Sequence, residues 1–477
     1  MTLAVRRTEQ NRPPARAERA QEDEFRPRGA PWTLLASAGV VTMAGGLLGL
    51  RNTVLATTLT LQAVFIVYFL RHLAFVLAAF WLQSHDTELE SLDDTELPAI
   101  TVLVACRNEE AVLDDLLPAL RELDYPSDRL QTIIVDDAST DSTGSRLDQA
   151  TEVEPILVIH RPPGSRGGKS GALNAAVASV TGDVIVVFDA DHRPRTDVLR
   201  RLARHFVDPR VGAVQGRCVI RNGDEGPLAR VIEIDYLSGY LVNEYGRQAL
   251  FGLPAYGGAN CAVRTSTLRA LGGWNEQSVT EDTDLTLRVL LSGQRVHYDV
   301  TAVDDEEAVT TIRRFWRQRY RWARGHQQVW RDFRRPVWQS RRISLLQKLE
   351  TTMFLLVFHI PVASAIGLAL LPVWIVTAVS LGTPIDRYAF ALWTVLFLGP
   401  LLELGGGLLL GNADRRRALA LFYFFPVFLL SIAVGTKAWL DGVLGKPYAW
   451  VKTQRSADRL VPIDDDPTTA TMVGGQA

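Results

Sequence analysis

Five apolar runs of roughly bilayer length lie near the two ends of this chain, and they restrict its fold more than any other feature. They are Trp32–Leu50, Thr53–Leu70, Leu345–Val379, Tyr388–Leu410 and Leu419–Leu440. A helix needs about 20 apolar residues to cross a bilayer, and each run is near that length. Buried helices of a large soluble protein are the alternative, but one such protein is not expected to contain five of these runs. The sequence therefore predicts transmembrane helices on both sides of a central domain.

The N-terminal part is predicted to begin and end on the cytoplasmic side. Residues 1–31 are rich in arginine, proline and glutamine and are interpreted as a disordered tail, and arginines favour the cytoplasm. Residues 32–83 then form two transmembrane helices, which return the chain to that side. Arg71 and His72 interrupt the second run, so Leu73–Leu82 either prolongs that helix or lies at the membrane interface. Residues 84–97 are interpreted as an acidic, solvated linker.

The C-terminal part, residues 343–440, is predicted to hold three or four transmembrane or interfacial helices. The run Leu345–Val379 exceeds one span, so it is either an interfacial helix followed by a span or a tight hairpin. The arginine cluster at 412–417 favours the cytoplasm and three spans. The basic residues near Lys446 and Lys452 favour the opposite side, which leaves the number open. A polar tail, 441–477, follows, and we expect a multi-pass protein of the cell (inner) membrane whose central domain is cytoplasmic.

Net charge and cysteine content exclude two classes of protein. The formal net charge is -2, which argues against binding to nucleic acid through bulk charge. The three cysteines, Cys106, Cys218 and Cys261, form no CxxC pair, so neither a disulfide framework nor a zinc site is indicated. We expect three reduced thiols.

The central region, 98–342, has the alternation of an α/β domain. Helical patterns separate four β-rich runs, which are Ile100–Ala105, Thr132–Val135, Ile156–Ile159 and Val184–Phe188. Such alternation predicts a doubly wound, mostly parallel sheet. Ligands of these sheets bind at the carboxyl ends of the strands, so polar motifs at those ends are expected to share one cleft.

Two aspartate motifs follow predicted strands. Asp136 and Asp137 come after the second strand and suit recognition of a ribose or base by charged hydrogen bonds, whereas Asp141 is expected to cap the next helix. Asp189 and Asp191 follow the fourth strand and are separated by one residue, so both can reach one cation. Mg²⁺ and Mn²⁺ prefer such oxygen ligands and are usually shared with substrate phosphates. A metal–diphosphate site is therefore predicted there.

The segment 167–174 resembles a phosphate-binding loop but lacks the GxxxxGK[ST] spacing, so a P-loop is not indicated. Lys169 is predicted to meet a diphosphate or a nucleobase edge near the start of a helix. A turn that only initiates the helix is the alternative.

A run of acids begins another predicted helix at Thr280–Asp284. Capping explains an acid at a helix start, but three acids in four residues exceed that need. A transfer reaction to a hydroxyl needs a general base, and Asp282 is chosen for that role.

A basic helix is predicted from Arg313 to Arg342. Gln318, Arg321 and Trp322 share one face because they are spaced i, i+3 and i+4. We expect the outer arginines to contact anionic lipid heads. Arg321 is expected to neutralise a leaving diphosphate, and Trp322 to stack on a sugar.

At these residues the chain resembles the family 2 glycosyltransferases, from about Ile100 to Gln328. Together, in this order, the motifs that carry the resemblance are highly specific. They are Asn108-Glu109, Asp136-Asp137, the Gly-Lys and Ala-Leu-Asn segment that ends at Asn174, Asp189-Ala-Asp191, Val214-Gln215, Thr280-Glu281-Asp282 and the QxxRW motif of Gln318, Arg321 and Trp322. One departure is Ala105-Cys-Arg-Asn108, where many members have a proline, and we expect no functional consequence.

The resemblance implies a GT-A fold flanked by transmembrane helices and an enzyme that moves a sugar from a nucleotide-diphospho-sugar with Mg²⁺ or Mn²⁺. It implies that Asp189 and Asp191 hold the metal, that Asp282 is the base, with Glu281 and Arg321 in the catalytic set, and that QxxRW lines the acceptor end. The donor-binding residues it implies are Asn108, Glu109, Asp136, Asp137, Lys169 and Asp189.

The chain has predicted membrane spans on both sides of the domain and a QxxRW motif, and in this it resembles two groups within the family. One is the β-monoglucosyldiacylglycerol synthases, to which segments such as Gly272–Glu276 and Trp450–Thr453 look closer. The other is the processive β-polysaccharide synthases, which extrude a cellulose-, mannan- or poly-N-acetylglucosamine-like chain. The expected reaction is an inverting transfer of glucose from a UDP-sugar to a membrane lipid. The alternative acceptor is a growing glycan. A membrane scaffold without activity is disfavoured because every catalytic motif is intact.

Overall fold

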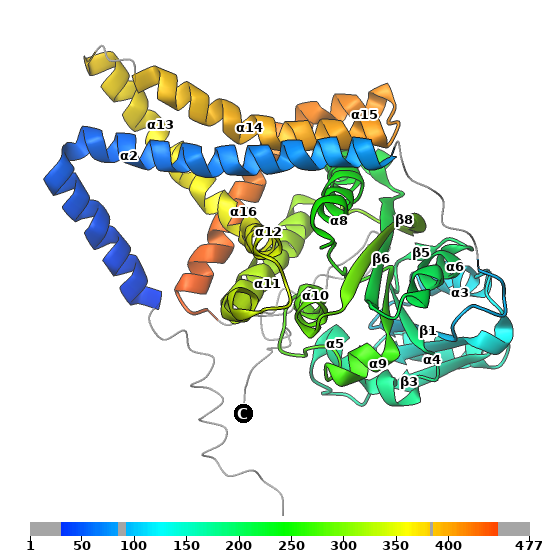
Figure 1. Cartoon of the computed structure of the whole chain (residues 1–477). Helices are drawn as coiled ribbons and strands as arrows, with labels where there is room; N and C mark the ends of the chain where they lie inside the picture. Colours follow the sequence, from blue (N-terminus) through cyan, green and yellow to red (C-terminus); the bar gives the residue numbers. More distant parts are fainter. Residues whose placement is uncertain (1–29, 84–91, 382–384, 447–477) are drawn as a thin grey trace, which may run out of the picture.

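An α/β domain with helices packed along one side makes up the molecule (Figure 1). The structure is a computed structural model that describes residues 30–83, 92–381 and 385–446. Nearly all of the predicted N-terminal tail and most of the acidic linker and C-terminal tail lie outside the described residues.

An eight-stranded sheet forms the centre of the domain, in the order β3-β2-β1-β4-β7-β6-β8-β5. Its strands are β1 (Ile100–Cys106), β2 (Leu130–Asp136), β3 (Ile156–His160), β4 (Val184–Asp189), β5 (Arg193–Pro194), β6 (Val211–Ile220), β7 (Cys261–Arg264) and β8 (Arg295–Glu306). The four predicted strands, β1 to β4, are confirmed and pair in parallel.

The other half of the sheet contains both kinds of pairing: β6 and β8 pair in parallel, so most strand pairs of the sheet are parallel, as predicted. β7 runs antiparallel to β4 and β6, and β5 runs antiparallel to β8, so the sheet is mixed. The cause is the route of the chain. It leaves β6 and re-enters at β7 from the same end of the sheet, after a helical excursion whose direction no local pattern specifies.

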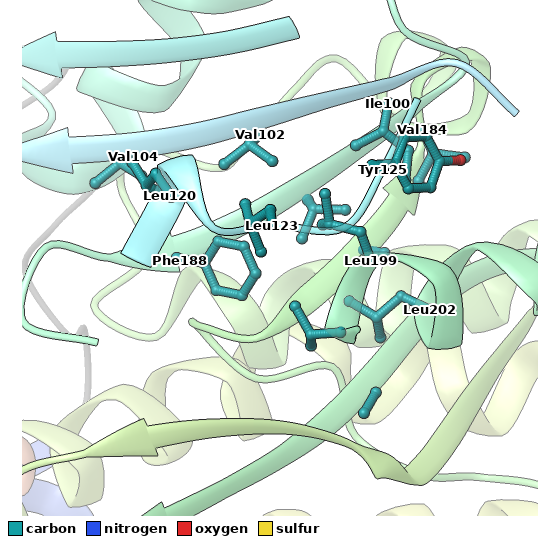
Figure 2. Close-up of a cluster of buried hydrophobic side chains, with 14 of the residues drawn as sticks. Ile100, Val102, Val104, Leu120, Leu123, Tyr125, Val184, Phe188, Leu199 and Leu202 are labelled. Atoms are coloured by element: carbon teal, nitrogen blue, oxygen red, sulfur yellow. The ribbon is translucent and has the colours of Figure 1, made fainter. Parts of the chain in front are cut away.

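Alternate residues of the central strands point to opposite faces, and helices cover both. Val102 and Val104 face α3 (Leu113–Arg121) and α6 (Val198–Ala203), as Figure 2 shows for this cluster. Leu103 lies on the other face with residues of α5 (Gly168–Ala176) and α10 (Glu281–Ser292). Strands buried on both faces read as continuous apolar runs, which is why β1 and β4 were recognisable.

The remaining helices of the domain are α4 (Thr143–Thr151), α7 (Pro227–Ser238), α8 (Tyr245–Phe251), α9 (Thr265–Ala270) and α11 (Ile312–Gln339). A π-helical segment, η5 (Gly239–Glu244), joins α7 to α8. π-helical turns are rare and occur often at functional sites. Together, α7, η5 and α8 form one long excursion between β6 and β7. They contact the apolar helices α2 and α14.

The apolar runs form α2 (Ala30–Gln83), α12 (Leu345–Leu356), α13 (Ile360–Leu381), α14 (Ile385–Leu410), α15 (Arg415–Leu419) and α16 (Phe424–Val443). Within the described ranges, three segments are long and apolar enough to cross a membrane, Asn52–Leu82, Leu345–Val373 and Arg415–Val443, and Thr394–Leu410 is a shorter apolar helix. Leu73–Leu82 prolongs the second run, as one of the two alternatives predicted. A break at Gly49 (φ 78°) separates that run from the first.

These helices pack directly on the α/β domain. A Cβ at Gly246 of α8 would lie 2.7 Å from the Phe75 side chain of α2, and one at Gly407 of α14 would lie 2.7 Å from the backbone of Ser238. Arg71 of α2 pairs with Glu350 of α12 at 2.7 Å. Residues at the carboxyl edge of the sheet and residues of α2, α12 and α14 line a common space.

Candidate active site

One cavity of about 640 Å³ lies at the carboxyl edge of the sheet and extends to the apolar helices. Ten of the twelve predicted site residues line it: Glu109, Asp137, Lys169, Asp189, Asp191, Glu281, Asp282, Gln318, Arg321 and Trp322. Residues far apart in sequence meet here because the parallel register brings the ends of β1, β2 and β4 to the same level, with Ala105 opposite Asp189 and Cys106 opposite Asp136.

The end of β4 offers ligands for a cation. Oxygen or nitrogen atoms of Asp189, Asp191 and His192 lie within 4.8 Å of one another. Two carboxylates and an imidazole fit a divalent ion such as Mn²⁺ or Mg²⁺. His192 was not among the predicted site residues, although it directly follows the second aspartate.

His192 is held from behind by β8. Its Nδ1 lies 2.7 Å from Asp304 Oδ2, and both side chains are buried. Burial opposes the charged imidazolium, but Asp304 and Glu306 outweigh it and keep the pKa of His192 well above its usual value. A protonated imidazole cannot ligate a metal through its protonated nitrogen, whereas the carboxylates of Asp189 and Asp191 could both reach one cation.

Lys169 connects the metal side of the cavity to the acidic helix. Its Nζ pairs with Asp189 and donates a hydrogen bond to the Gly258 carbonyl at 2.6 Å. Burial disfavours the ammonium form, yet Asp189 and Glu281 raise the pKa of this lysine above its usual value. Gly167 (φ 88°) lets the chain turn sharply before α5, so the segment does start a helix, and the contact of Lys169 with a diphosphate or nucleobase stays a prediction.

Two carboxylates meet at the first turn of α10. A Cβ at Gly258 would lie 3.3 Å from Asp282 Oδ2, 3.4 Å from Lys169 Nζ and 3.9 Å from Glu281 Oε1. Burial and the neighbouring Asp282 raise the pKa of Glu281 to about 7. The third acid of the run, Asp284, instead bonds Asn275 at 2.9 Å and pairs with Arg288.

A buried glutamine positions the Gly258 loop. Gln215 at the middle of β6 donates hydrogen bonds to the carbonyls of Gly216, Ala259 and Asn260 at 2.8–3.2 Å and accepts one from the Gly257 N–H. Gln215 of the Val214-Gln215 motif thus shapes the site through its hydrogen bonds to backbone groups.

The basic helix α11 closes the cavity with Gln318, Arg321 and Trp322. A Cβ at Gly325 would lie 2.3 Å from Thr280 Cγ2, so the absence of a side chain there lets α11 approach the start of α10. One turn after Trp322, burial holds the pKa of His326 down to about 4 against the opposing charge of Asp282. A neutral imidazole near Asp282 was not expected from the sequence.

Of the residues predicted to bind the nucleotide-sugar, some line the cavity and others do not. Asp137 lines the cavity, pairs with Arg161 and lies 3.7 Å from Arg107, and burial raises its pKa. Asp136 and Asn108 lie outside the lining. Asp136 accepts a hydrogen bond from the Ser139 N–H at 3.0 Å and contacts His160 at 2.9 Å.

Asn108 and Asp141 hold the neighbouring loops together. Asn108 (φ 52°) accepts a hydrogen bond from the Thr140 N–H at 2.7 Å. Asp141 accepts one from the Thr143 N–H at 3.0 Å at the start of α4, although the N-cap residue of this helix is Ser142.

The part of the lining nearest the apolar helices was not predicted at all. It includes Arg71 and His72 of α2, Asn243 and Glu244 of η5, Arg247 of α8 and Glu403 of α14. His72 Nδ1 lies 2.5 Å from Glu403 Oε2. Charged residues are rare within apolar helices, so Arg71, His72 and Glu403 could have indicated a functional site. In the sequence, Arg71 and His72 were interpreted only as an interruption of an apolar run.

Known glycosyltransferases resemble this chain in sequence and in fold. Residues 184–433 match the glycosyl transferase family group 2. The Bacillus subtilis (strain 168) protein YdaM, named as a probable glycosyltransferase, is 32% identical over 75% of this chain and 84% of its own length. A beta-monoglucosyldiacylglycerol synthase of Synechocystis sp. is 38% identical over 58% of each chain. A poly-beta-1,6-N-acetyl-D-glucosamine synthase of Staphylococcus aureus is 30% identical over 50% of this chain and 57% of its own.

The present chain thus spans somewhat over half the length of those two synthases. Among solved structures, the mannosyltransferase PcManGT from Pyrobaculum calidifontis, in complex with GDP-Man and Mn²⁺, superposes with a TM-score of 0.58 at 24% identity. The match covers 82% of this chain and 99% of that one. This likeness establishes the GT-A fold.

Proposed function

This chain belongs to the glycosyl transferase family group 2, and we propose that it transfers glucose from UDP-glucose to a membrane lipid such as diacylglycerol. The observation that carries the proposal is that one cavity is lined both by Asp189, Asp191 and Asp282 and by residues of the apolar helices α2, α12 and α14. The similarity to the monoglucosyldiacylglycerol synthases supports the choice of lipid and sugar.

The donor side is assigned to the carboxyl edge of the sheet. Asp189 and Asp191 would hold Mg²⁺ or Mn²⁺, which offsets the charge of the diphosphate when bound. Lys169 holds Asp189 in place beside this site. Asp137 and Glu109 lie on the same wall and suit the nucleoside, because ionised carboxylates accept strong hydrogen bonds from ribose hydroxyls.

We assign binding of the acceptor to the start of α10 and the middle of α11. Asp282 takes the proton of the acceptor hydroxyl as its oxygen bonds the anomeric carbon, and the bond from that carbon to the diphosphate oxygen breaks. A single displacement of this kind inverts the anomeric configuration. Arg321 offsets the charge that develops on the diphosphate, and Trp322 stacks against a sugar. Glu281 lies beside Asp282 and Lys169.

A cytoplasmic placement of the domain is part of the proposal. Arg417 of α15 pairs with Glu233 of α7 at 2.7 Å, so the arginine-rich loop lies on the same side of the apolar helices as the α/β domain. Short arginine-rich loops favour the cytoplasm. UDP-sugars, the proposed donors, would then reach the cavity from that side.

The product of the reaction tests the proposed function. Membranes that contain the protein are incubated with radiolabelled UDP-glucose and diacylglycerol, and the label is partitioned. We expect chloroform-soluble label that migrates as monoglucosyldiacylglycerol. Ethanol-insoluble label sensitive to a glycanase would instead establish the alternative, a processive polysaccharide synthase. Absence of transfer with any nucleotide sugar would reject both.

Two substitutions test the assigned chemistry. Asp282→Asn removes the base and Asp191→Ala removes a metal ligand, and each should lower kcat at least a hundredfold, since losing one such group costs about 3 kcal/mol or more of transition-state stabilisation. Asp128→Asn, at an exposed position, is the control and should match the wild type. Thermal melting of each variant checks that it is folded, and robust turnover by either cavity variant would contradict the assignment.

A further inference from the structure

A second, smaller cavity of about 220 Å³ adjoins the first. The two share four lining residues: Asp235, Gly239, Asn243 and Glu403. Beyond them, the walls of the smaller cavity are mainly apolar and come from α7, α11, α14 and α16, including Phe315, Leu404, Phe424, Val427 and Phe428. We refer to it as the α14–α16 crevice.

The far end of the crevice lies among segments suited to a bilayer. Leu404 belongs to the apolar segment Thr394–Leu410, and the three residues of α16 belong to the candidate span Arg415–Val443. Around them, large apolar side chains are exposed, with Phe422 81% and Phe425 51% accessible. Such exposure is unfavourable in water and favourable in lipid, so this end of the crevice faces acyl chains.

The near end of the crevice, and the adjoining part of the larger cavity, hold charges that already have partners. Arg319 pairs with Asp235 and stacks over Trp322 at 4.6 Å. His72 pairs with Glu403, and Arg71 and Arg247 both contact Glu350, at 2.7 and 3.2 Å. A phosphate arriving here would have to displace a carboxylate from one of these cations, which favours an uncharged headgroup.

A neutral polar group is present to meet a hydroxyl. The Asn243 amide, on the π-helical segment, lines both cavities and makes no hydrogen bond to any residue within the described ranges. An amide both donates and accepts hydrogen bonds, so it suits a glycerol hydroxyl or ester carbonyl.

From this arrangement we propose that the α14–α16 crevice binds the lipid acceptor. A neutral lipid with a free hydroxyl enters sideways between α14 and α16, its acyl end lies against Phe424, Val427 and Phe428, and Asn243 orients its glycerol. The free hydroxyl then points along the shared wall into the larger cavity, toward Asp282. This inference rests on the proposed function and specifies where and how its acceptor binds.

Blocking the crevice tests the proposal. Ser431 of α16 lines the crevice, and Ala433, two residues on, is exposed on the same helix. In detergent micelles, Ser431→Trp should raise KM for dioleoylglycerol at least tenfold, because the indole fills the crevice, while KM for UDP-glucose changes less than twofold. Ala433→Trp carries the same bulk outside the crevice and should leave both values within twofold of the wild type.

A second measurement does not depend on activity. A diacylglycerol with a diazirine on one acyl chain should photolabel peptides of α14 and α16 in the wild-type protein. Unlabelled dioleoylglycerol should compete for this labelling, and phosphatidic acid should compete at least tenfold less well. Ser431→Trp should lose the competable fraction.

The outcomes separate the two levels of the proposal. A wild-type KM for dioleoylglycerol in Ser431→Trp, or competable labelling confined to other helices, overturns the crevice while leaving the glycolipid synthase in place. Stronger competition by phosphatidic acid overturns the neutral headgroup. Failure of the wild-type protein to form any chloroform-soluble product overturns the proposed function itself, and the crevice proposal with it.

Discussion

Glu281 lies buried beside Asp282, and this placement makes the stability of the protein depend on pH. Burial and the neighbouring charge raise its pKa from 4.5 to about 7 in the folded state. Above pH 7 the carboxylate is ionised in both states, and its burial costs the folded state about 3 kcal/mol, from 1.36 kcal/mol per pKa unit. As pH falls from 7 to 4.5 the folded state binds the proton first, and this cost disappears.

Glu281→Gln should therefore raise the melting temperature by several degrees at pH 8 and leave it nearly unchanged at pH 4.5. Thermal-shift measurements on the detergent-solubilised protein at both values check this expectation. Glu152→Gln, at an exposed position, serves as the control and should shift neither. An equal gain in melting temperature at both pH values would show that ionisation of Glu281 does not destabilise the folded state.

At the scale of elements, the close approach of α10 and α11 decides the shape of the cavity. Gly325→Ala places a methyl group 2.3 Å from Thr280 Cγ2, and either helix must move. We expect kcat to fall at least tenfold because Arg321 and Trp322 shift relative to Asp282, with a smaller effect on KM for the donor. Steady-state kinetics with lipid and UDP-glucose measure both values.

The matched control is the same substitution where nothing crowds the helix. A Cβ at Gly405 of α14 would meet no atom within 4 Å. Gly405→Ala should keep wild-type kinetics and add up to about 1 kcal/mol of stability, because alanine favours a helix over glycine. Equal kinetics for the two variants would show that the contact between α10 and α11 does not set the geometry.

At the scale of the whole molecule, one buried carboxylate connects three parts of the chain. Glu350 of α12 contacts Arg71 of α2 and Arg247 of α8, and all three side chains are less than 9% exposed. Glu350→Gln removes the charge partner of buried Arg71 and the nearer of two carboxylates beside buried Arg247, whose other neighbour is Glu244 at 3.5 Å. Removing one member of a buried pair costs about 3–5 kcal/mol, so we expect a marked fall in melting temperature.

An exposed pair gives the comparison for this variant. Asp208 pairs with Arg210 at 2.8 Å on the surface, and surface pairs contribute about 0–1 kcal/mol. Asp208→Asn should therefore change the melting temperature little. A melting temperature for Glu350→Gln as high as that of Asp208→Asn would show that the network does not hold the apolar helices to the α/β domain.

The sequence by itself determined the features that local chemistry controls. Continuous apolar runs required buried strands or long apolar helices, and carboxylates directly after the strands required a polar edge. For that reason β1 to β4, the Asp189–Asp191 pair, the acids at the start of α10 and the QxxRW face were all predictable, and they share one cavity.

Only the tertiary structure decided the rest, because it depends on contacts between segments far apart in the chain. Asp136 and Asn108 carry the same polar groups as their neighbours, but their hydrogen bonds to nearby loops place them outside the lining. The antiparallel β7 depends on where a long excursion returns. The part of the cavity nearest the apolar helices depends on how α2 and α14 pack against η5, since residues such as Asn243 and Glu403 have no shared pattern until the fold brings them together.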